Sequence, residues 1–255
     1  MRKLSSVALL LIFFVSAAHA QWRQISSQAE PSPVGGLEHR YMVVEDSKSG
    51  QRASLELAIF SPKSCRLRVV DQASARLDLE EVMTHGNFLA GVNGGYFDPQ
   101  YHPIGLRIAE GKMVAPMQRA RLLTGVLSAS PGKVQILRVG EFSLKQKPEA
   151  AVEAGPMLVD LGKGVRGLES RKLARRTFAA ATAGDKAALG FCSEVTLADL
   201  SNILATVTVP GFKIQRALNL DGGSSSAFWF KRANGSAFSI SEQKRVRDFV
   251  AVVPR

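Results

Sequence analysis

Alternation of apolar and polar residues predicts short β-strands along most of the chain. Between residues 53 and 60, Leu55, Leu57 and Ile59 alternate with less apolar residues, the period-2 pattern of a half-buried strand. Three pairs of apolar runs flank turn sequences that contain glycine, which predicts hairpins. Further strands follow from β-rich runs bounded by turn residues, at 41–45, 65–70, 89–92, 105–108, 113–114, 123–128, 133–139, 156–159, 177–182, 187–191, 217–220 and 249–253.

Helix signals are few. Asp78 can cap a helix over residues 79–85, with Glu81 at the capping-box position and Gly86 just beyond the end. A second helix is predicted after Thr196, because the apolar residues that follow recur on one face. Many strands with two or three helices, without strict alternation, predict an α+β fold: a single domain with a mixed, mostly antiparallel sheet over residues 38–255.

The N-terminus has the order of a secretory signal peptide. Arg2 and Lys3 precede an uninterrupted apolar run at 7–15, and Ala18-His19-Ala20 is the small-x-small pattern before a cleavage site. The run is too short for a membrane anchor, since about 20 residues are needed to span a bilayer. We therefore expect residues 1–20 to be removed, leaving a flexible lead at 21–37, no transmembrane segment and an exported protein, periplasmic or secreted.

Composition and charge narrow the class of partner. The 255 residues are 45% hydrophobic and 22% charged, a globular composition that excludes a disordered or collagen-like chain. The formal net charge is +11, and about +9 once Arg2 and Lys3 are removed. A basic protein favours anionic partners. Because the chain is expected to be exported, these are anionic or phosphorylated glycans rather than nucleic acid.

The two cysteines, Cys65 and Cys192, leave two readings open. An even number in an exported chain permits one disulfide, and two separately buried thiols are the alternative. Neither reading supplies a zinc site, because no CxxC spacing is present.

Two segments share one physical form. In each, a short apolar strand delivers Asn or Asp to its end and is followed by paired glycines, at 89–98 and at 217–226. Paired glycines permit positive φ and close approach of the backbone to a ligand, and their N–H groups can bind anions. A simple hairpin turn explains the first segment equally well. The second carries Asn219, Asp221 and three serines, which exceeds the needs of a turn.

These motifs resemble those of the phosphodiester glycosidase domain family. The two carrying segments are Asn93-Gly94-Gly95-Tyr96-Phe97 and Asn219-Leu220-Asp221-Gly222-Gly223-Ser224-Ser225. Three further segments occur in the family's order: Pro103-Ile104-Gly105-Leu106 with Gly111-Lys112, then Gly155-Pro156-Met157-Leu158-Val159, then Arg176-Thr177 with Gly184-Asp185. The resemblance spans about 86–254. It implies a hydrolase that cleaves a sugar-1-phosphodiester at the glycosidic bond.

Three departures put the substrate in doubt more than the fold. Ser224 stands where the family often has a third glycine. Phe178 follows Arg176-Thr177 where the family often has alanine, and the segment 245–249 is only partly similar to the family's last strand.

The resemblance and the chemistry together suggest roles for individual residues. An oxocarbenium-like transition state needs a carboxylate near the anomeric carbon. Asp221 is the expected main carboxylate and Asp98 the second, with Glu153 less favoured. A guanidinium suits phosphate, so Arg176 is expected to clamp it.

The remaining site residues are expected to bind substrate. Thr177 would donate to phosphate, and Asn93 and Asn219 would orient sugar hydroxyls or a metal. The predicted substrate-binding set is Asn93, Gly94, Gly95, His102, Arg176, Thr177, Asn219, Gly222, Gly223, Ser224 and Ser225. Hard oxygen ligands, chiefly Asp221 and Asn219 with Asn93 and Asp98 nearby in sequence, leave calcium or magnesium open, and no other cofactor is expected.

Alternatives remain at the level of the sequence. Arg176 belongs to a basic stretch that could be a solvated face, and Asp98 could simply initiate a turn. The leading interpretation is an exported hydrolase acting in envelope or exopolysaccharide metabolism. A non-catalytic periplasmic module that binds anionic glycan is the main alternative, and a basic envelope protein that tethers anionic polymer is the third.

Overall fold

The computed structural model describes residues 22–73 and 77–255, so the predicted signal peptide lies outside the described residues. Three β-sheets dominate the protein, and every strand pairing in the described residues is antiparallel. The mostly antiparallel pairing expected from the sequence is confirmed, whereas the single mixed sheet is corrected to three separate antiparallel sheets. Parallel strands require long crossovers, usually helical, and this chain joins its strands mostly by short turns.

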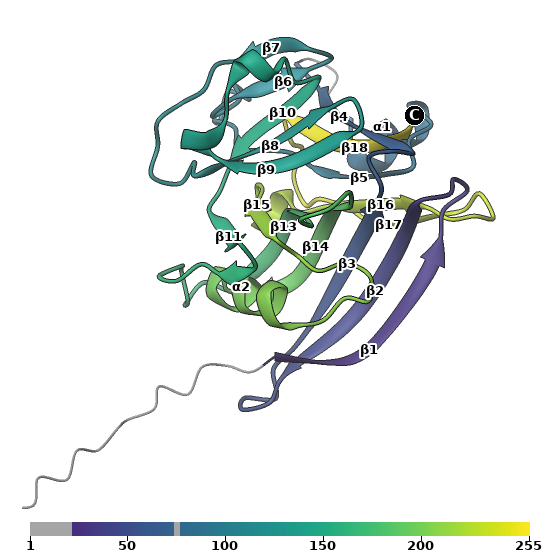
Figure 1. Ribbon diagram of the computed structural model, residues 1–255, viewed down its shortest axis with the longest axis vertical. Helices are drawn as coiled ribbons and strands as arrows, with labels where there is room; N and C mark the ends of the chain where they lie inside the picture. Colours follow the sequence, from purple (N-terminus) through teal and green to yellow (C-terminus); the bar gives the residue numbers. More distant parts are fainter. Residues whose placement is uncertain (1–21, 74–76) are drawn as a thin grey trace, which may run out of the picture.

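The largest sheet has eight strands and lies in the lower half of Figure 1. Helix α2 (Leu197–Thr206) packs against this sheet. The strands, in spatial order, are β1 (Trp22–Pro31), β2 (Leu37–Asp46), β3 (Arg52–Phe60), β14 (Ala187–Val195), β13 (Ala174–Ala181), β15 (Arg216–Asn219), β11 (Met157–Asp160) and β12 (Lys163–Gly164).

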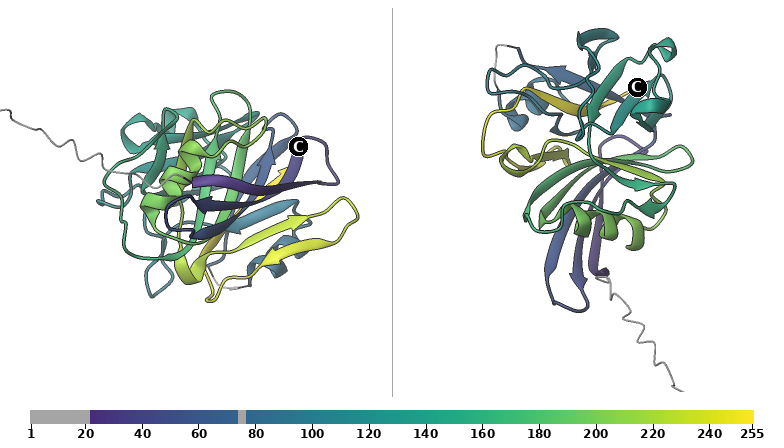
Figure 2. Two further views of the ribbon diagram at one scale, coloured as in Figure 1. Left: turned by 90° about the horizontal axis from the view of Figure 1, so that it is seen from below. Right: turned by 90° about the vertical axis from the view of Figure 1, so that its left-hand side faces the viewer.

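Two five-stranded sheets lie above it in Figure 1 and in the right-hand view of Figure 2. One has the order β7 (Lys112–Ala115), β6 (Arg107–Ala109), β10 (Ala150–Ala154), β8 (Gly125–Ser130) and β9 (Lys133–Arg138). The other has the order β17 (Ala237–Ile240), β16 (Phe228–Lys231), β5 (Ala90–Asn93), β18 (Asp248–Pro254) and β4 (Cys65–Asp71). Helix α1 (Leu79–His85) packs on the second, and short 3₁₀ turns lie at Val139–Glu141 (η1), Leu144–Gln146 (η2) and Gly223–Ser225 (η3).

The predicted flexible lead at 21–37 was wrong. Residues Trp22–Pro31 form β1, which pairs with β2 along its length as the edge strand of the large sheet. Most of its side chains are exposed, and Trp22 alone is buried at its start. An edge strand is held mainly by backbone hydrogen bonds to one neighbour, so its Ser- and Gln-rich sequence does not reveal it.

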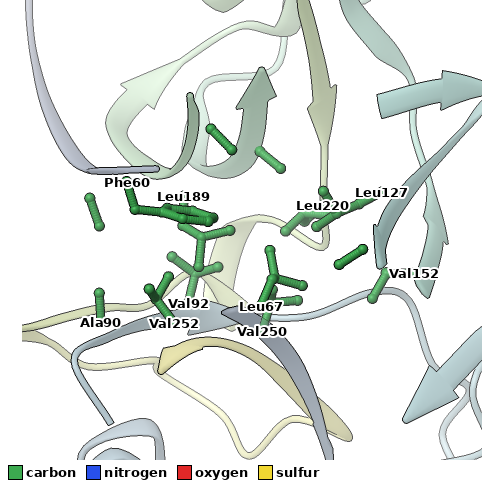
Figure 3. Packing of buried hydrophobic residues seen from close by; sticks show 14 of the residues in the cluster. Phe60, Leu67, Ala90, Val92, Leu127, Val152, Leu189, Leu220, Val250 and Val252 are labelled. Carbon is green, nitrogen blue, oxygen red and sulfur yellow. The ribbon is translucent and has the colours of Figure 1, made fainter. Parts of the chain in front are cut away.

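The main core fills the space between the large sheet and the two smaller ones (Figure 3). Phe60 and Leu189 reach it from the large sheet, and Leu127 and Val252 come from the smaller sheets. A second cluster lies on the opposite face of the large sheet, under α2. Strand β3 therefore buries both faces, and the half-buried pattern expected for it is corrected. Its Glu56 is also buried and accepts a hydrogen bond from His39 at 2.7 Å.

Both predicted helices are confirmed. The Asp78 carboxylate accepts from the Glu81 N–H, and the Glu81 carboxylate accepts from the Asp78 N–H, which completes the capping box of α1. The Thr196 hydroxyl accepts from the Asp199 N–H and caps α2.

The two cysteines are free, buried thiols. Cys65 belongs to the main core, whereas Cys192 belongs to the cluster under α2. The structure therefore favours the reading of two separate thiols over a disulfide.

Candidate active site

Asn93 joins the two glycine turns. It ends β5 and is fully buried, and its Nδ2 donates to the main-chain oxygen of Asp221 at 2.7 Å. Its Oδ1 accepts from the Thr177 hydroxyl at 2.6 Å and from the Ala227 N–H at 3.1 Å. The motifs that lie 128 residues apart in the sequence thus meet at one amide. Because Thr177 and Asn93 satisfy each other, they hold the turns together rather than face a ligand.

Asp221 presents the only carboxylate among the residues of the second turn. Its N–H donates to the Gly94 oxygen at 3.1 Å, and its Oδ1 accepts from the Gly222 N–H at 2.9 Å. Burial raises the pKa of Asp221, while the neighbouring Ser225 hydroxyl and the Lys244 ammonium oppose that rise. The side chain is half-buried, so it can still be reached by a ligand.

Gly223 is the glycine of this turn that needs its conformational freedom. Its φ is +65°, in the left-handed region, where it begins η3 directly after Asp221-Gly222. This turn directs residues 224–226 back toward β16.

Asn219 and Tyr96 form the wall beside Asp221. The Tyr96 hydroxyl donates to the Gly155 carbonyl at 2.6 Å, and Asn219 Nδ2 donates to the same carbonyl at 3.1 Å and to the Tyr96 oxygen at 3.0 Å. Burial and the charge of Asp221 raise the pKa of Tyr96. Asn219 Oδ1 is buried without a hydrogen-bond partner within the described residues.

Arg176 lies inside the site and is not part of a solvated face. Its guanidinium Nε donates to the Val195 carbonyl at 3.0 Å and Nη2 to the Lys172 carbonyl at 2.7 Å, with 8% of the residue exposed. Burial lowers its pKa, and its charge acts on the Tyr96 hydroxyl. Two of the three guanidinium nitrogens therefore donate to main-chain oxygens. Fewer N–H groups are left to bind phosphate than the sequence suggested.

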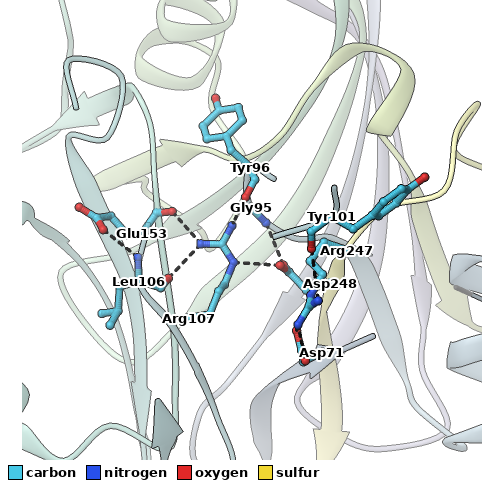
Figure 4. Close-up of polar contacts among 9 residues, drawn as sticks. All are labelled: Asp71, Gly95, Tyr96, Tyr101, Leu106, Arg107, Glu153, Arg247 and Asp248. Atoms are coloured by element: carbon cyan, nitrogen blue, oxygen red, sulfur yellow. Dashed lines mark hydrogen bonds and ion pairs between the residues drawn. The ribbon is translucent and has the colours of Figure 1, made fainter. Parts of the chain in front are cut away.

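A buried ion pair supports the first turn (Figure 4). Arg107 Nε and Asp248 Oδ2 are 2.9 Å apart, and neither side chain is exposed. Asp248 Oδ1 accepts from the Gly95 N–H at 3.0 Å, and Arg107 Nη2 donates to the Tyr96 carbonyl at 3.0 Å. The pair fixes the backbone that carries Tyr96 into the site.

Gly94 and Gly95 are explained by this ion pair. A Cβ at Gly94 would collide with the Asp248 carboxylate, and a Cβ at Gly95 would collide with the Arg107 guanidinium. Neither glycine is among those with positive φ. The sequence suggested that these glycines let a ligand approach the backbone. In the structure, the space that a side chain would fill at each glycine is occupied by the Arg107–Asp248 ion pair.

Asp98 and His102 lie in a loop beside the site. Asp98 Oδ1 accepts from the N–H groups of Gln100 and His102, and the Asp98 Oδ2 lies 3.0 Å from His102 Nδ1. The His102 side chain is 75% exposed. These bonds match the turn-forming role that the sequence left open for Asp98. Hydrogen bonds of the described residues do not link this pair to Asp221.

Glu153 has a supporting position. It is fully buried in β10, and its Oε2 accepts from the N–H groups of Leu106 and Gln118. It thereby fixes two loops and contributes its main-chain oxygen to Arg107 at 3.1 Å.

Two of the oxygen donors considered for a cation, Asn93 and Asp98, are engaged by protein partners. Both of the polar atoms of Asn93 are occupied by protein partners. Asp98 is bonded within its own loop. Over residues 22–73 and 77–255, no group of three or more His, Cys, Asp or Glu side chains is arranged to hold a metal.

Sequence reasoning missed the residues that act at long range. Arg107, Asp248 and Lys244 carried no local signal of a role, although the segment that holds Lys244 and Asp248 was noted for its partial likeness to the family. A cavity of about 1150 Å³ lies elsewhere, between α2 and residues 162–168, and none of the predicted site residues lines it.

The comparisons with known proteins agree with this geometry. The family model described as phosphodiester glycosidase matches residues 86–253, which include both glycine turns, so the chain belongs to the phosphodiester glycosidase family. An uncharacterised protein of Escherichia coli K12, YigE, is 30% identical over 91 residues. That match covers 33% of this chain and 36% of YigE.

Solved structures share the fold. The catalytic domain of zebrafish N-acetylglucosamine-1-phosphodiester α-N-acetylglucosaminidase, auto-inhibited by its pro-peptide, aligns with a TM-score of 0.66 at 17% identity, covering 90% of this chain and 88% of that one. A hypothetical protein from Synechocystis aligns with a TM-score of 0.60 at 15% identity, covering 92% and 68%. Within the described residues, no helix is long and apolar enough to cross a membrane.

Proposed function

We propose that this protein is a hydrolase that cleaves the glycosidic bond of a sugar-1-phosphodiester. The observation that carries the proposal is that Asp221, Asn219 and Arg176 gather around the Tyr96 side chain and the second glycine turn, with the Asp221 backbone held by the Asn93 amide. Family membership supports the reaction class. The predicted signal peptide supports an exported enzyme that acts on envelope glycan or exopolysaccharide.

Asp221 is the group that stabilises the reacting sugar. When the bond between C1 and the bridging oxygen breaks, its electron pair leaves with the phosphate and positive charge develops on the sugar ring. An ionised carboxylate beside that ring stabilises the charge. Water then supplies oxygen to C1, and its proton is released. A phosphate leaving group needs little acid assistance because it departs as a stable anion.

The neighbouring residues orient the substrate. Asn219 Nδ2 fixes the Tyr96 hydroxyl and the Gly155 carbonyl in the wall of the site. Gly222 and Ser224 border the half-buried surface beside Asp221. Arg176 contributes positive charge close to the departing phosphate, with two nitrogens fixed by the Val195 and Lys172 carbonyls. No step is assigned to a metal ion.

The test is turnover of the purified mature protein on a panel of sugar-1-phosphodiesters, with product analysis. The expected products are the free sugar and the phosphate monoester. Parallel reactions with calcium, with magnesium and with a chelator test the cation that the sequence left open. If no member of the panel is cleaved and anionic glycan still binds, the protein is a binding module and the hydrolase proposal is wrong.

A further inference from the structure

The loop at 241–247, between β17 and β18, lies against the second glycine turn. The Gln243 N–H donates to the Ser224 oxygen at 2.7 Å. On the other side of the loop, the Arg245 guanidinium lies 3.4 Å from the Asp78 carboxylate and 3.2 Å from that of Glu81, at the start of α1. The Arg245 ion pairs are exposed and contribute little to holding the loop, so the Gln243–Ser224 bond is what keeps residue 244 beside the second turn.

The Lys244 side chain extends over the ring of Phe97. Its ammonium nitrogen lies 5.2 Å from the centre of the Phe97 ring, a cation–π contact, and the residue is exposed. Phe97 belongs to the first motif, and the Gln243 N–H bond to Ser224 keeps the neighbouring backbone against the second, so the ammonium lies between the two motifs. Its charge also opposes the rise that burial causes in the pKa of Asp221. Ion pairs of the described residues do not include Lys244, so its charge is available to a ligand.

Arg176 has part of its guanidinium committed to the protein. The phosphate has two non-bridging oxygens, and a planar guanidinium would normally bind both. Here Nε and Nη2 of Arg176 are engaged by the Val195 and Lys172 carbonyls. Nη1 and the second hydrogen of Nη2 remain for one side of the phosphate, and an exposed lysine on a four-carbon stem can move toward the other.

We propose that Lys244 binds the phosphate of the substrate and makes the enzyme selective for anionic, phosphate-containing leaving groups. The inference rests on the proposed function and deepens it. Negative charge on the phosphate increases as the bond between C1 and the bridging oxygen breaks. An adjacent ammonium therefore stabilises the transition state more than the bound substrate. A neutral leaving group has no such charge for Lys244 to contact.

The first experiment compares two substrates of the same sugar: the 4-nitrophenyl phosphodiester of its 1-phosphate and the neutral 4-nitrophenyl glycoside. Lys244→Met should lower kcat/KM for the phosphodiester by about 10- to 100-fold, the range of one charge-assisted hydrogen bond, and change the glycoside by less than about threefold. Lys244→Arg should recover part of the loss. Assays are run well above the acidic limb of the pH profile, so that Asp221 stays ionised in every variant.

Arg245→Met is the matched control, because it removes a charge from the same loop that faces Asp78 and Glu81 instead. It should leave both substrates unaffected. If Lys244→Met weakens both substrates equally, or neither, the selectivity role is wrong. If Arg245→Met reproduces the loss, general loop charge explains the effect and the proposal is also wrong.

A binding measurement separates this proposal from the proposed function. Inorganic phosphate is titrated into wild type, Lys244→Met and Arg245→Met at fixed ionic strength. Binding that is lost only in Lys244→Met supports the phosphate site even if no substrate is turned over. Equal binding by Lys244→Met and wild type overturns it even if the hydrolase activity is real.

Discussion

The Arg107 guanidinium and the Asp248 carboxylate form an ion pair, 2.9 Å between Nε and Oδ2, in which neither side chain reaches solvent. The pair joins residues 141 positions apart and lies directly against Gly94 and Gly95. The ion pair therefore makes the first glycine turn depend on β18, the last strand of the chain.

Asp248→Asn should destabilise the protein strongly. It leaves the Arg107 charge buried without its partner, which costs about 3–5 kcal/mol of unfolding free energy. Urea denaturation gives the value. The double variant Arg107→Met with Asp248→Leu should recover part of the loss, because neither charge is then buried. A cost below about 1 kcal/mol for Asp248→Asn would show that water reaches the pair.

Asp221→Asn should abolish hydrolysis and keep the fold. Asn retains an oxygen to accept from the Gly222 N–H but lacks the charge that stabilises the oxocarbenium-like state. We expect a loss of about 10³-fold or more, about 4 kcal/mol of barrier. Asp98→Asn is the control and should change kcat by only a few-fold, since Asp98 is bonded within its own loop. Equal rates for Asp221→Asn and wild type would remove Asp221 from the mechanism.

The pH profile should follow Asp221. Burial raises its pKa above the usual aspartate value of 3.8, so the acidic limb of kcat/KM should lie above that pH. A carboxyl with a raised folded-state pKa favours folding only while protonated, and this contribution is lost as pH rises through that pKa. Asp221→Asn should therefore be more stable than wild type at neutral pH. The difference should vanish below the usual aspartate pKa. Thermal melts across this range measure it, and a constant difference would contradict it.

Arg176→Lys should impair both folding and turnover although charge is retained. An ammonium cannot bridge the Val195 and Lys172 carbonyls as the guanidinium does. We expect about 1–3 kcal/mol lower stability and at least about tenfold lower kcat/KM. Arg171→Lys, on the exposed part of the same basic stretch, should behave as wild type. Near-normal kinetics and melting for Arg176→Lys would exclude a role in the site.

Reductant should not change the melting temperature. Cys65 and Cys192 are free and belong to clusters on opposite faces of the large sheet. A bond between them would close a long loop, and its loss would cost roughly 4–5 kcal/mol. Non-reducing peptide mapping should find two free thiols. A linked peptide pair would contradict the packing described above.

Structural features that depend on residues close together in the sequence could be predicted from the sequence. The Asp78 and Glu81 capping box and the three hairpins follow from spacing alone, and the structure confirms them. Strand β1 was missed because its pairing depends on backbone bonds rather than on apolar side chains.

The site was predictable only as motifs. Asp221 and Asn219 could be singled out because they follow one apolar strand, and the sequence also brought Asn93 to the same site through the family resemblance. What Asn93 and Thr177 do there depends on contacts between residues 84 positions apart. The same holds for Arg107, whose partner lies at the far end of the chain. A pattern of neighbouring residues cannot show which buried charged side chains form an ion pair with each other.

Strand β18 has a consequence for biosynthesis. It inserts between β4 and β5 and brings Asp248 to Arg107 and to the Gly95 N–H. A growing chain that has not yet produced residues 248–254 lacks the ion pair, the support of the first turn and the strand that joins β4 to β5. The first glycine turn therefore cannot take its final form before this strand is complete.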